Sequence, residues 1–204
     1  EDIKMFLLRA PMGGNKKGAI SQNTASTYFS ILKAGLKQAF IDEYLTVDIN
    51  AKVKGITNIE KPRVALTMNE VQMLVDTPCK DDVLKRAFLF SILTGLRHSD
   101  IQTLRWKQIQ QTSKGTWQAV VIQQKTKRPD YKPVIQQALQ LCGIRPDDDE
   151  ALVFEGLTDA SWISRPLKVW IEASGIKKHI TFHMSRHINS SYSLKTRNLQ
   201  RLSA

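Results

Sequence analysis

Three short segments carry the side chains best suited to chemistry on a phosphate group. Residues 94–100 read TGLRHSD and contain Arg97, residues 125–127 read KTK, and residues 183–187 read HMSRH. An arginine guanidinium is planar and meets two phosphate oxygens at once, while lysine and histidine can give or move a proton. Together these groups could stabilise negative charge on a phosphate and protonate a leaving oxygen.

Each segment taken alone is a weak indication. An arginine after a helix is usually paired with a carboxylate or solvated, and a basic hairpin tip is usually a solvated turn. His183 and Arg186 would share one face of a helix capped by Thr181, but such pairs arise by chance in many proteins. The order and spacing of the three segments along one chain therefore carry the indication.

The composition fits a globular protein with a polyanionic partner. Of 204 residues, 42% are hydrophobic, and 30 Lys and Arg outnumber 19 Asp and Glu, giving a formal net charge of +11. Such a charge attracts nucleic acid at long range, although many proteins are basic for solubility alone. Cys79 and Cys142 form no metal-binding pattern, and no segment has the length to cross a bilayer. We expect a cytoplasmic protein without a metal or cofactor.

The elements that must position these segments are mostly helices. Residues 1 to about 52 are predicted to be helical, with Asn23 or Thr24 capping a helix whose apolar residues recur at helical spacing. Residues 52–64 contain glycine, proline and four positive charges with little periodicity. That pattern indicates an extended basic linker and a domain boundary.

A second domain is predicted to begin at Thr67, since Thr67 and Glu70 form a capping box for a helix. Asp81 or Asp82 can start the next helix, and Gly95 suits its left-handed end. A buried helix, a β-hairpin with a basic tip and a further helix are predicted over residues 83–94, 117–135 and 159–174. The expected fold class is mainly α with a small β-hairpin or sheet.

The ordered set of motifs resembles the tyrosine recombinase, or phage integrase, family. The family carries T-G-L-R-x-x-[ED]-[LI], then a hairpin lysine, then H-x-x-R-H, which stand here as TGLRHSDIQTLRW (94–106), QQKTKRPDYKPV (123–134) and TFHMSRH (181–187). Residues 20–45 look like the end of the family's helical core-binding domain. Residues 66–74 look like the opening helix of its catalytic domain.

The resemblance implies a domain plan and an activity. We expect a helical core-binding domain over residues 1–58, a linker over 59–66 and an α+β catalytic domain over 67–204. The implied activity is site-specific recombination or integration of a mobile element through a 3′-phosphotyrosyl intermediate. The implied partners are a double-stranded DNA site and, on that DNA, three further copies of the full-length chain in a tetramer.

The resemblance also assigns roles to particular residues. Arg97 and Arg186 would hold the phosphate oxygens, Lys125 would protonate the leaving 5′ oxygen, and His183 would hydrogen-bond the phosphate or shuttle a proton. Asp100 would hold the Arg97 guanidinium in place. The family pattern favours Lys125 over Lys127 as the hairpin lysine.

Further residues are candidates for contacts to the DNA backbone. They lie in the first domain, in the linker and at the hairpin tip: Lys16, Lys17, Thr24, Thr27, Tyr28, Lys33, Lys52, Lys54, Lys127 and Arg128. We expect the two domains and the linker to grip the duplex as a clamp. A solvated face is nearly as good an interpretation of each lysine.

The sequence departs from the family pattern after His187. The family continues with a further His or Trp and then the nucleophilic tyrosine, several helical turns on, whereas here the chain reads INSSYSLKTRNLQRLSA. Tyr192 lies six residues after Arg186, too close to reach the phosphate held by the arginines. We expect a chain that begins inside its first domain and lacks the nucleophile, and therefore binds DNA without the covalent step.

Two rival interpretations stay open. His179, His183 and His187 are spaced by four and could line a helix face as the metal site of a nuclease. Only Glu172 is near enough in sequence to complete a ligand set, and the surrounding cationic side chains disfavour a divalent ion. Alternatively, the chain is a non-catalytic integrase remnant that occupies recombination sites.

Overall fold

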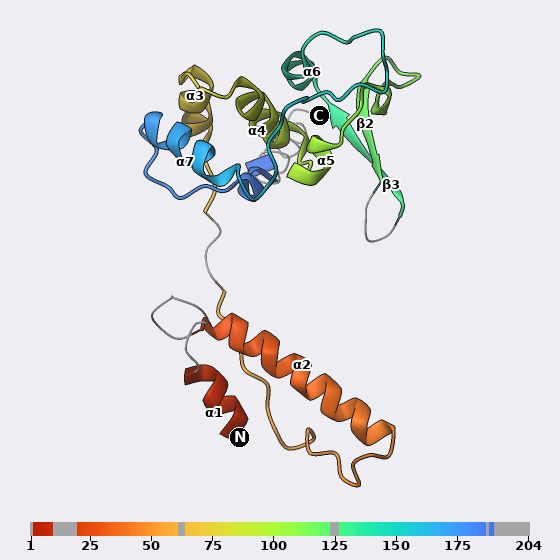
Figure 1. The fold of residues 1–204 in the computed structure, drawn as a ribbon, viewed down its shortest axis with the longest axis vertical. Coiled ribbons are helices and arrows are strands. Elements are labelled where there is room, and N and C mark those ends of the chain that lie inside the picture. Colours follow the sequence, from red (N-terminus) through yellow and green to blue (C-terminus); the bar gives the residue numbers. More distant parts are fainter. Residues whose placement is uncertain (1, 10–19, 61–63, 123–126, 187, 190–204) are drawn as a thin grey trace, which may run out of the picture. The chain divides into compact units, whose positions relative to one another are not determined.

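The computed structural model describes residues 2–9, 20–60, 64–122, 127–186 and 188–189. The chain divides into two compact units, residues 1–62 and residues 63–204 (Figure 1). No helix among the described residues is both long and apolar enough to cross a membrane.

The first unit pairs two helices, α1 (Asp2–Arg9) and α2 (Gln22–Ile41). The N-cap of α2 is Ser21, whose hydroxyl accepts the Thr24 backbone N–H. The prediction of Asn23 or Thr24 as the cap was therefore wrong by a few residues, because several polar side chains that can cap stand in a row. The small core of the unit consists of Ala25, Phe29 and Ile56, with Leu7, Leu8, Ile20 and Val53 packed against it.

The prediction that residues 1 to about 52 are helical was wrong beyond α2. Residues 42–52 form turns and bends, and residues 53–60 have no regular secondary structure. This segment runs back along α2 because α2 side chains satisfy its backbone: the Ser26 hydroxyl donates to the Ile56 carbonyl (2.8 Å), and Asn23 exchanges two hydrogen bonds with the Ile59 backbone. Part of the expected linker is thus packed on the first unit.

The second unit opens with α3 (Met68–Asp76) and α4 (Asp82–Thr94). The predicted capping box at Thr67 and Glu70 is present, and Asp81 caps α4 through the Leu84 backbone N–H. Buried residues lie on all sides of α4, since its position between α3 and α7 on one side and the sheet on the other leaves it little contact with water (Figure 1). Gly95 ends α4 with a φ of 72°, as predicted.

The rest of the second unit combines short helices with three strands. They are α5 (His98–Gln102), the 3₁₀ helix η1 (Trp106–Gln108), strands β1 (Ile109–Gln111), β2 (Trp117–Ile122) and β3 (Pro129–Val134), α6 (Gln136–Cys142), α7 (Ser164–Ala173) and the 3₁₀ helix η2 (Phe182–Met184). The sheet is antiparallel in the order β1-β2-β3. The hairpin prediction holds, whereas β1 and α6 were missed because both are short and lack a clear period.

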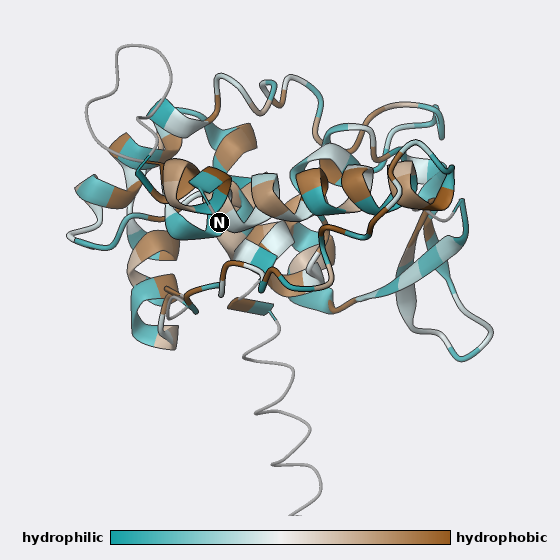
Figure 2. Ribbon diagram, turned by 90° about the horizontal axis from the view of Figure 1, so that it is seen from below, coloured by the Kyte–Doolittle hydropathy of each residue, from teal (hydrophilic) through white to brown (hydrophobic). Residues whose placement is uncertain are grey.

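One hydrophobic core holds the second unit together. Its largest fully buried side chains include Phe88 and Phe90 of α4, Phe154, Leu104 and Leu167. Aromatic rings contact one another within this core. The Phe88 ring is nearly perpendicular to the rings of Trp170 and Phe182, at centroid distances of 5.9 Å and 5.4 Å. Figure 2 shows hydrophilic and hydrophobic residues side by side on the same helices, as expected for elements that bury one face. The mainly helical fold class with a small sheet is confirmed.

Candidate active site

Arg97 stands at the point where α4 gives way to α5. Gly95 turns the backbone out of α4, Leu96 is buried, and Arg97 is the exposed residue that precedes α5. The Asp100 carboxylate accepts the backbone N–H of Arg97 at 3.2 Å. Asp100 thus fixes the main chain of Arg97, because the residue before a short helix has an unsatisfied N–H. A contact of Asp100 with the Arg97 guanidinium stays a prediction.

His183 and Arg186 lie in and just after the 3₁₀ helix η2, and the chain continues helical through Arg186. His183 is exposed and Arg186 is half-buried. The Arg186 Nε donates a hydrogen bond of 2.9 Å to the Gly95 carbonyl. The fold thus joins the H-x-x-R-H segment to the turn that carries Arg97.

Aromatic packing holds the same two segments together. The His98 ring, next in sequence to Arg97, lies edge-on to the Phe182 ring at 5.0 Å, and Phe182 directly precedes His183. The His98 Nε2 lies 3.0 Å from the Thr158 carbonyl oxygen, and this contact fixes the orientation of the ring. The two motifs are therefore packed against each other through residues that sequence analysis did not assign to the site, since neither residue type is distinctive by itself.

The predicted hairpin lysine, Lys125, lies outside the described residues. The β2–β3 pairing ends at Ile122 and Pro129. Beyond that pair, Lys127 and Arg128 are exposed, and Lys127 has a φ of 53°. A positive φ in a residue other than glycine is typical of a tight turn.

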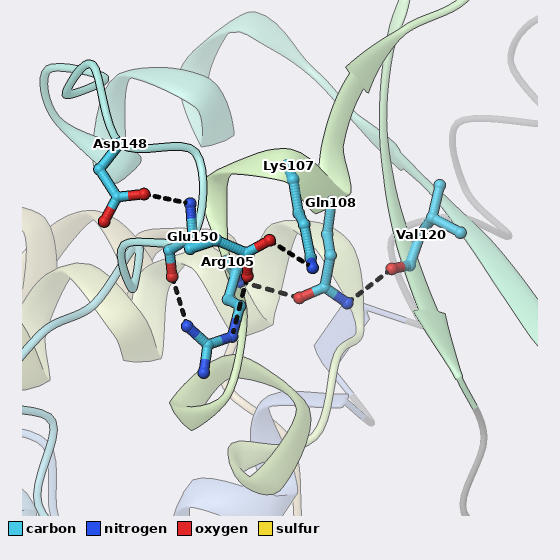
Figure 3. Close-up of polar contacts among 6 residues, drawn as sticks. All are labelled: Arg105, Lys107, Gln108, Val120, Asp148 and Glu150. Atoms are coloured by element: carbon cyan, nitrogen blue, oxygen red, sulfur yellow. Dashed lines mark hydrogen bonds and ion pairs between the residues drawn. The ribbon is translucent and has the colours of Figure 1, made fainter.

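The base of the sheet is attached to the acidic run of residues 147–150. The Glu150 carboxylate pairs with Lys107 Nζ at 2.7 Å, and the Glu150 carbonyl accepts from the Arg105 guanidinium (Figure 3). The Gln108 side chain accepts the Arg105 backbone N–H and donates to the Val120 carbonyl. Residues 147–150 are all exposed, and the Glu150 side chain and backbone hold the turn between α5 and the sheet.

The first-unit candidates differ in how accessible they are. Thr27, Tyr28, Lys52 and Lys54 are exposed. The Lys33 ammonium instead donates to the Val53 carbonyl at 2.5 Å, which gives this residue a structural role in holding the returning segment. The Thr24 hydroxyl is hydrogen-bonded to the Ser21 hydroxyl. Lys16 and Lys17 lie outside the described residues.

The described residues offer no ready metal site. Among them, no three side chains of His, Cys, Asp or Glu lie close enough to hold an ion. Two of the three histidines of the rival metal-site hypothesis, His179 and His183, are exposed, and His187 lies outside the described residues.

This mainly helical fold, with its small antiparallel sheet, is similar to the folds of several solved structures. The structure of a lambda integrase (75–356) dimer bound to a COC′ core site is similar with a TM-score of 0.64 at 19% identity, over 82% of this chain and 63% of that one. The XerH site-specific recombinase bound to palindromic difH substrate in its post-cleavage complex gives 0.62 at 16% identity, over 89% of this chain and 56% of that one.

A third similar structure is the Tn1549 transposon integrase (aa 82–397) with circular intermediate DNA, at a TM-score of 0.57 and 17% identity, over 87% of this chain and 68% of that one. At these identities the likeness concerns the fold. The chain spans less than two thirds of the first two structures. No curated protein matches the chain in sequence.

Two protein-family models match the sequence and identify its family. Residues 65–197 match the phage integrase family, and residues 1–54 match the phage integrase SAM-like domain. The chain therefore belongs to the phage integrase family, the family of tyrosine recombinases.

Proposed function

We propose that this protein carries out site-specific DNA recombination, with Arg97 and Arg186 binding the phosphate at which the strand is cut. The observation that carries the proposal is the hydrogen bond from Arg186 Nε to the Gly95 carbonyl, because it joins two cationic segments that are distant in sequence. The family membership and the DNA-bound relatives support the same function.

The proposed reaction is a phosphoryl transfer that needs no energy input. A tyrosine oxygen attacks the phosphorus, a bond from tyrosine to phosphorus forms, and the bond to the 5′ oxygen breaks. The tyrosine hydroxyl passes its proton to His183 or to water as it attacks, and Lys125 supplies one to the leaving 5′ oxygen. Arg97 and Arg186 stabilise the charge on the non-bridging oxygens, and His183 hydrogen-bonds the same phosphate. The phosphotyrosyl link keeps the bond energy, so a strand can be rejoined by the reverse steps.

The source of the nucleophile is the finer part of the proposal. Tyr192 is the single tyrosine in the sequence after Arg186, and it follows too closely to reach a phosphate held by that arginine. We infer that Tyr192 does not form the covalent link to DNA. The runner-up function, a DNA-binding integrase remnant, predicts DNA binding without a covalent link.

The experiment uses nicked suicide duplexes from the ends of the element. Gel shifts score binding, and denaturing gels score covalent adducts, for the chain and for Arg97→Ala/Arg186→Ala. Arg165→Ala is a matched control, since Arg165 is an exposed arginine on α7. Binding without adducts is expected, weakened in the double variant and retained in the control. Adducts abolished by the double variant would overturn the inference about the nucleophile, and absent binding at low salt would overturn the proposed function.

Backbone contacts are proposed for the exposed residues of both units and for the linker. Neutralising Lys52 and Lys54 should weaken binding to all duplexes alike and lower the salt dependence by about 0.9 in log–log slope for each phosphate that the protein no longer neutralises. Lys33→Ala is the informative control, because its ammonium is bonded to the Val53 carbonyl. It should lower stability and leave the salt slope unchanged.

Assembly on DNA is a further part of the proposal. The lambda integrase structures hold a dimer on a core site and a tetramer on a Holliday junction. We infer that full-length copies of this protein assemble likewise on paired recombination sites. Cross-linking on a synthetic junction would test this, and monomers alone at saturating DNA would contradict it.

A further inference from the structure

Two buried serines meet between the arginine-bearing segments. Ser91 of α4 and Ser185, each 0% exposed, have hydroxyl oxygens 2.5 Å apart. The Ser91 hydroxyl also contacts the Leu96 carbonyl (2.7 Å), and the Ser185 hydroxyl contacts the Phe182 carbonyl (2.6 Å). Two hydroxyls carry two protons for three contacts, so one serine donates to the other and the second donates to a carbonyl. One of the two carbonyl contacts therefore carries no hydrogen. If Ser185 donates to Ser91 and Ser91 donates to the Leu96 carbonyl, the hydrogen bonds run without a break from Ser185 to Leu96. We call this pair of hydroxyls the serine clasp.

The serine clasp contacts the immediate neighbours of both arginines. Leu96 precedes Arg97, and Ser185 precedes Arg186. When Ser185 donates to Ser91 and Ser91 donates to Leu96, the main chain next to one guanidinium is tied, through two side-chain oxygens, to the main chain next to the other. A buried hydrogen bond is stronger than an exposed one, because water does not compete for it.

Asn189 adds a second tie on the same turn. Its Nδ2 donates to the carbonyls of Ile92 and Leu93, both at 2.9 Å, which satisfies two of the acceptors left unpaired at the end of α4. Its Oδ1 lies 2.9 Å from where a Cβ on Gly95 would stand. The segment after Arg186 is thereby held against the turn that precedes Arg97.

We propose that Ser91, Ser185 and Asn189 are positioning residues that fix the separation of the Arg97 and Arg186 guanidinium groups, so that both bind one phosphate. The proposal rests on the proposed function, which assigns the two arginines to one phosphate. Groups that hold developing charge act best when their positions are fixed beforehand, since no free energy is then spent on ordering them. Both arginines sit at the edge of the core on long side chains, so their main-chain positions must be set by buried neighbours.

The experiment titrates inorganic phosphate into the ¹⁵N-labelled chain and follows the Nε–H signals of Arg97 and Arg186. Each signal is assigned by its loss in Arg97→Lys or Arg186→Lys. In the wild type both signals should shift along one curve with one Kd. In Ser91→Ala/Ser185→Ala the Kd should rise roughly tenfold and the two curves should separate, because the two groups no longer bind as a unit.

Controls separate positioning from folding. Ser174→Ala removes another buried hydroxyl with a helix-end carbonyl partner (Ile171, 2.7 Å) and should leave the common curve unchanged at a similar loss of melting temperature. If the double serine variant does not fold, Asn189→Leu serves instead, because Asn189 is half-buried and the change removes the donor at similar volume without adding a charge. Asn189→Gln, which keeps the donor, should restore part of the affinity.

Two outcomes would overturn the inference, and they are distinguishable. A wild type that binds phosphate along one curve, with clasp and Asn189 variants that bind it equally well, would refute the positioning role alone. A wild type in which neither arginine signal responds to phosphate would refute the proposed function, and the positioning role with it.

Discussion

The Nε of Arg186 donates a hydrogen bond of 2.9 Å to the carbonyl of Gly95, two residues before Arg97. This contact links the C-terminal motif to the end of α4, where the backbone must turn sharply at a φ of 72°. An L-residue with a side chain rarely adopts that conformation.

Gly95→Ala should lower the free energy of unfolding by about 2–3 kcal/mol, since it adds the cost of a left-handed alanine to a contact of 2.9 Å with Asn189. Gly156→Ala is the matched control, because Gly156 has a φ of 81° but nothing within 4 Å of the added Cβ. Gly156→Ala should lower the free energy of unfolding by about 1–2 kcal/mol. Urea unfolding at pH 7 measures both variants. Equal losses of stability would show that the Asn189 side chain moves aside without a loss of stability.

Glu70 should make the stability of the second unit depend on acid pH. Burial raises the pKa of the Glu70 carboxyl, but hydrogen bonds from Lys178 (2.7 Å) and the Thr67 backbone outweigh it and hold the pKa below its usual value of 4.5. A carboxyl with a lowered folded pKa stabilises the fold above the unfolded pKa, and that contribution is lost as the pH falls through the folded pKa.

Glu70→Gln should therefore be less stable than the wild type at pH 7, by roughly 1 kcal/mol, and the difference should shrink below about pH 4.5. Urea midpoints measured between pH 7 and pH 3 would show it. Glu172→Gln is the control, because Glu172 and its ion-pair partner Lys168 (3.6 Å) are both exposed and such pairs contribute little to stability. A constant gap between Glu70→Gln and wild type over this range would argue against the assignment.

The two cysteines should react with thiol reagents at different rates. Burial raises the pKa of the Cys142 thiol to about 12, and burial also raises the pKa of Cys79, which is only half-buried. The thiolate is the reactive form, so native Cys79 should react slowly with a disulfide reagent at pH 8 and Cys142 only after unfolding. Cys79→Ala should remove the native-state reaction, and fast labelling of that variant would disprove the burial of Cys142.

Gln108 should contribute more to stability than its neighbour on the strand. Its amide bridges the Arg105 backbone N–H (2.8 Å) and the Val120 carbonyl (2.9 Å), which joins the 3₁₀ turn to β2 (Figure 3). Gln108→Ala should lower the free energy of unfolding by about 1–2 kcal/mol, because both partners are left with poorer hydrogen bonds. Gln110→Ala, at an exposed residue, should stay within about 0.5 kcal/mol. The reverse order in a urea series would contradict this account.

The sequence alone determined several local elements and the identity of the chemical groups. The capping box at Thr67, the αL stop at Gly95 and the hairpin after Trp117 follow from short-range preferences, which act whatever the rest of the chain does. The three motifs were recognised by their residue types and spacing, and the family match agrees with them. Short elements without a clear period, β1 and α6, were missed because neighbouring elements decide their structure.

Only the tertiary structure decided which groups meet. Nothing in sequence relates Ser91 to Ser185, Asn189 to the end of α4, or Arg186 to the Gly95 carbonyl, since each contact depends on how two distant segments pack. The same holds for Asp100, whose carboxylate accepts the Arg97 backbone N–H, and for Lys33, whose ammonium is bonded to the Val53 carbonyl. The partner of a long polar side chain is set by the groups that packing leaves within a few ångströms, and the sequence does not contain that distance.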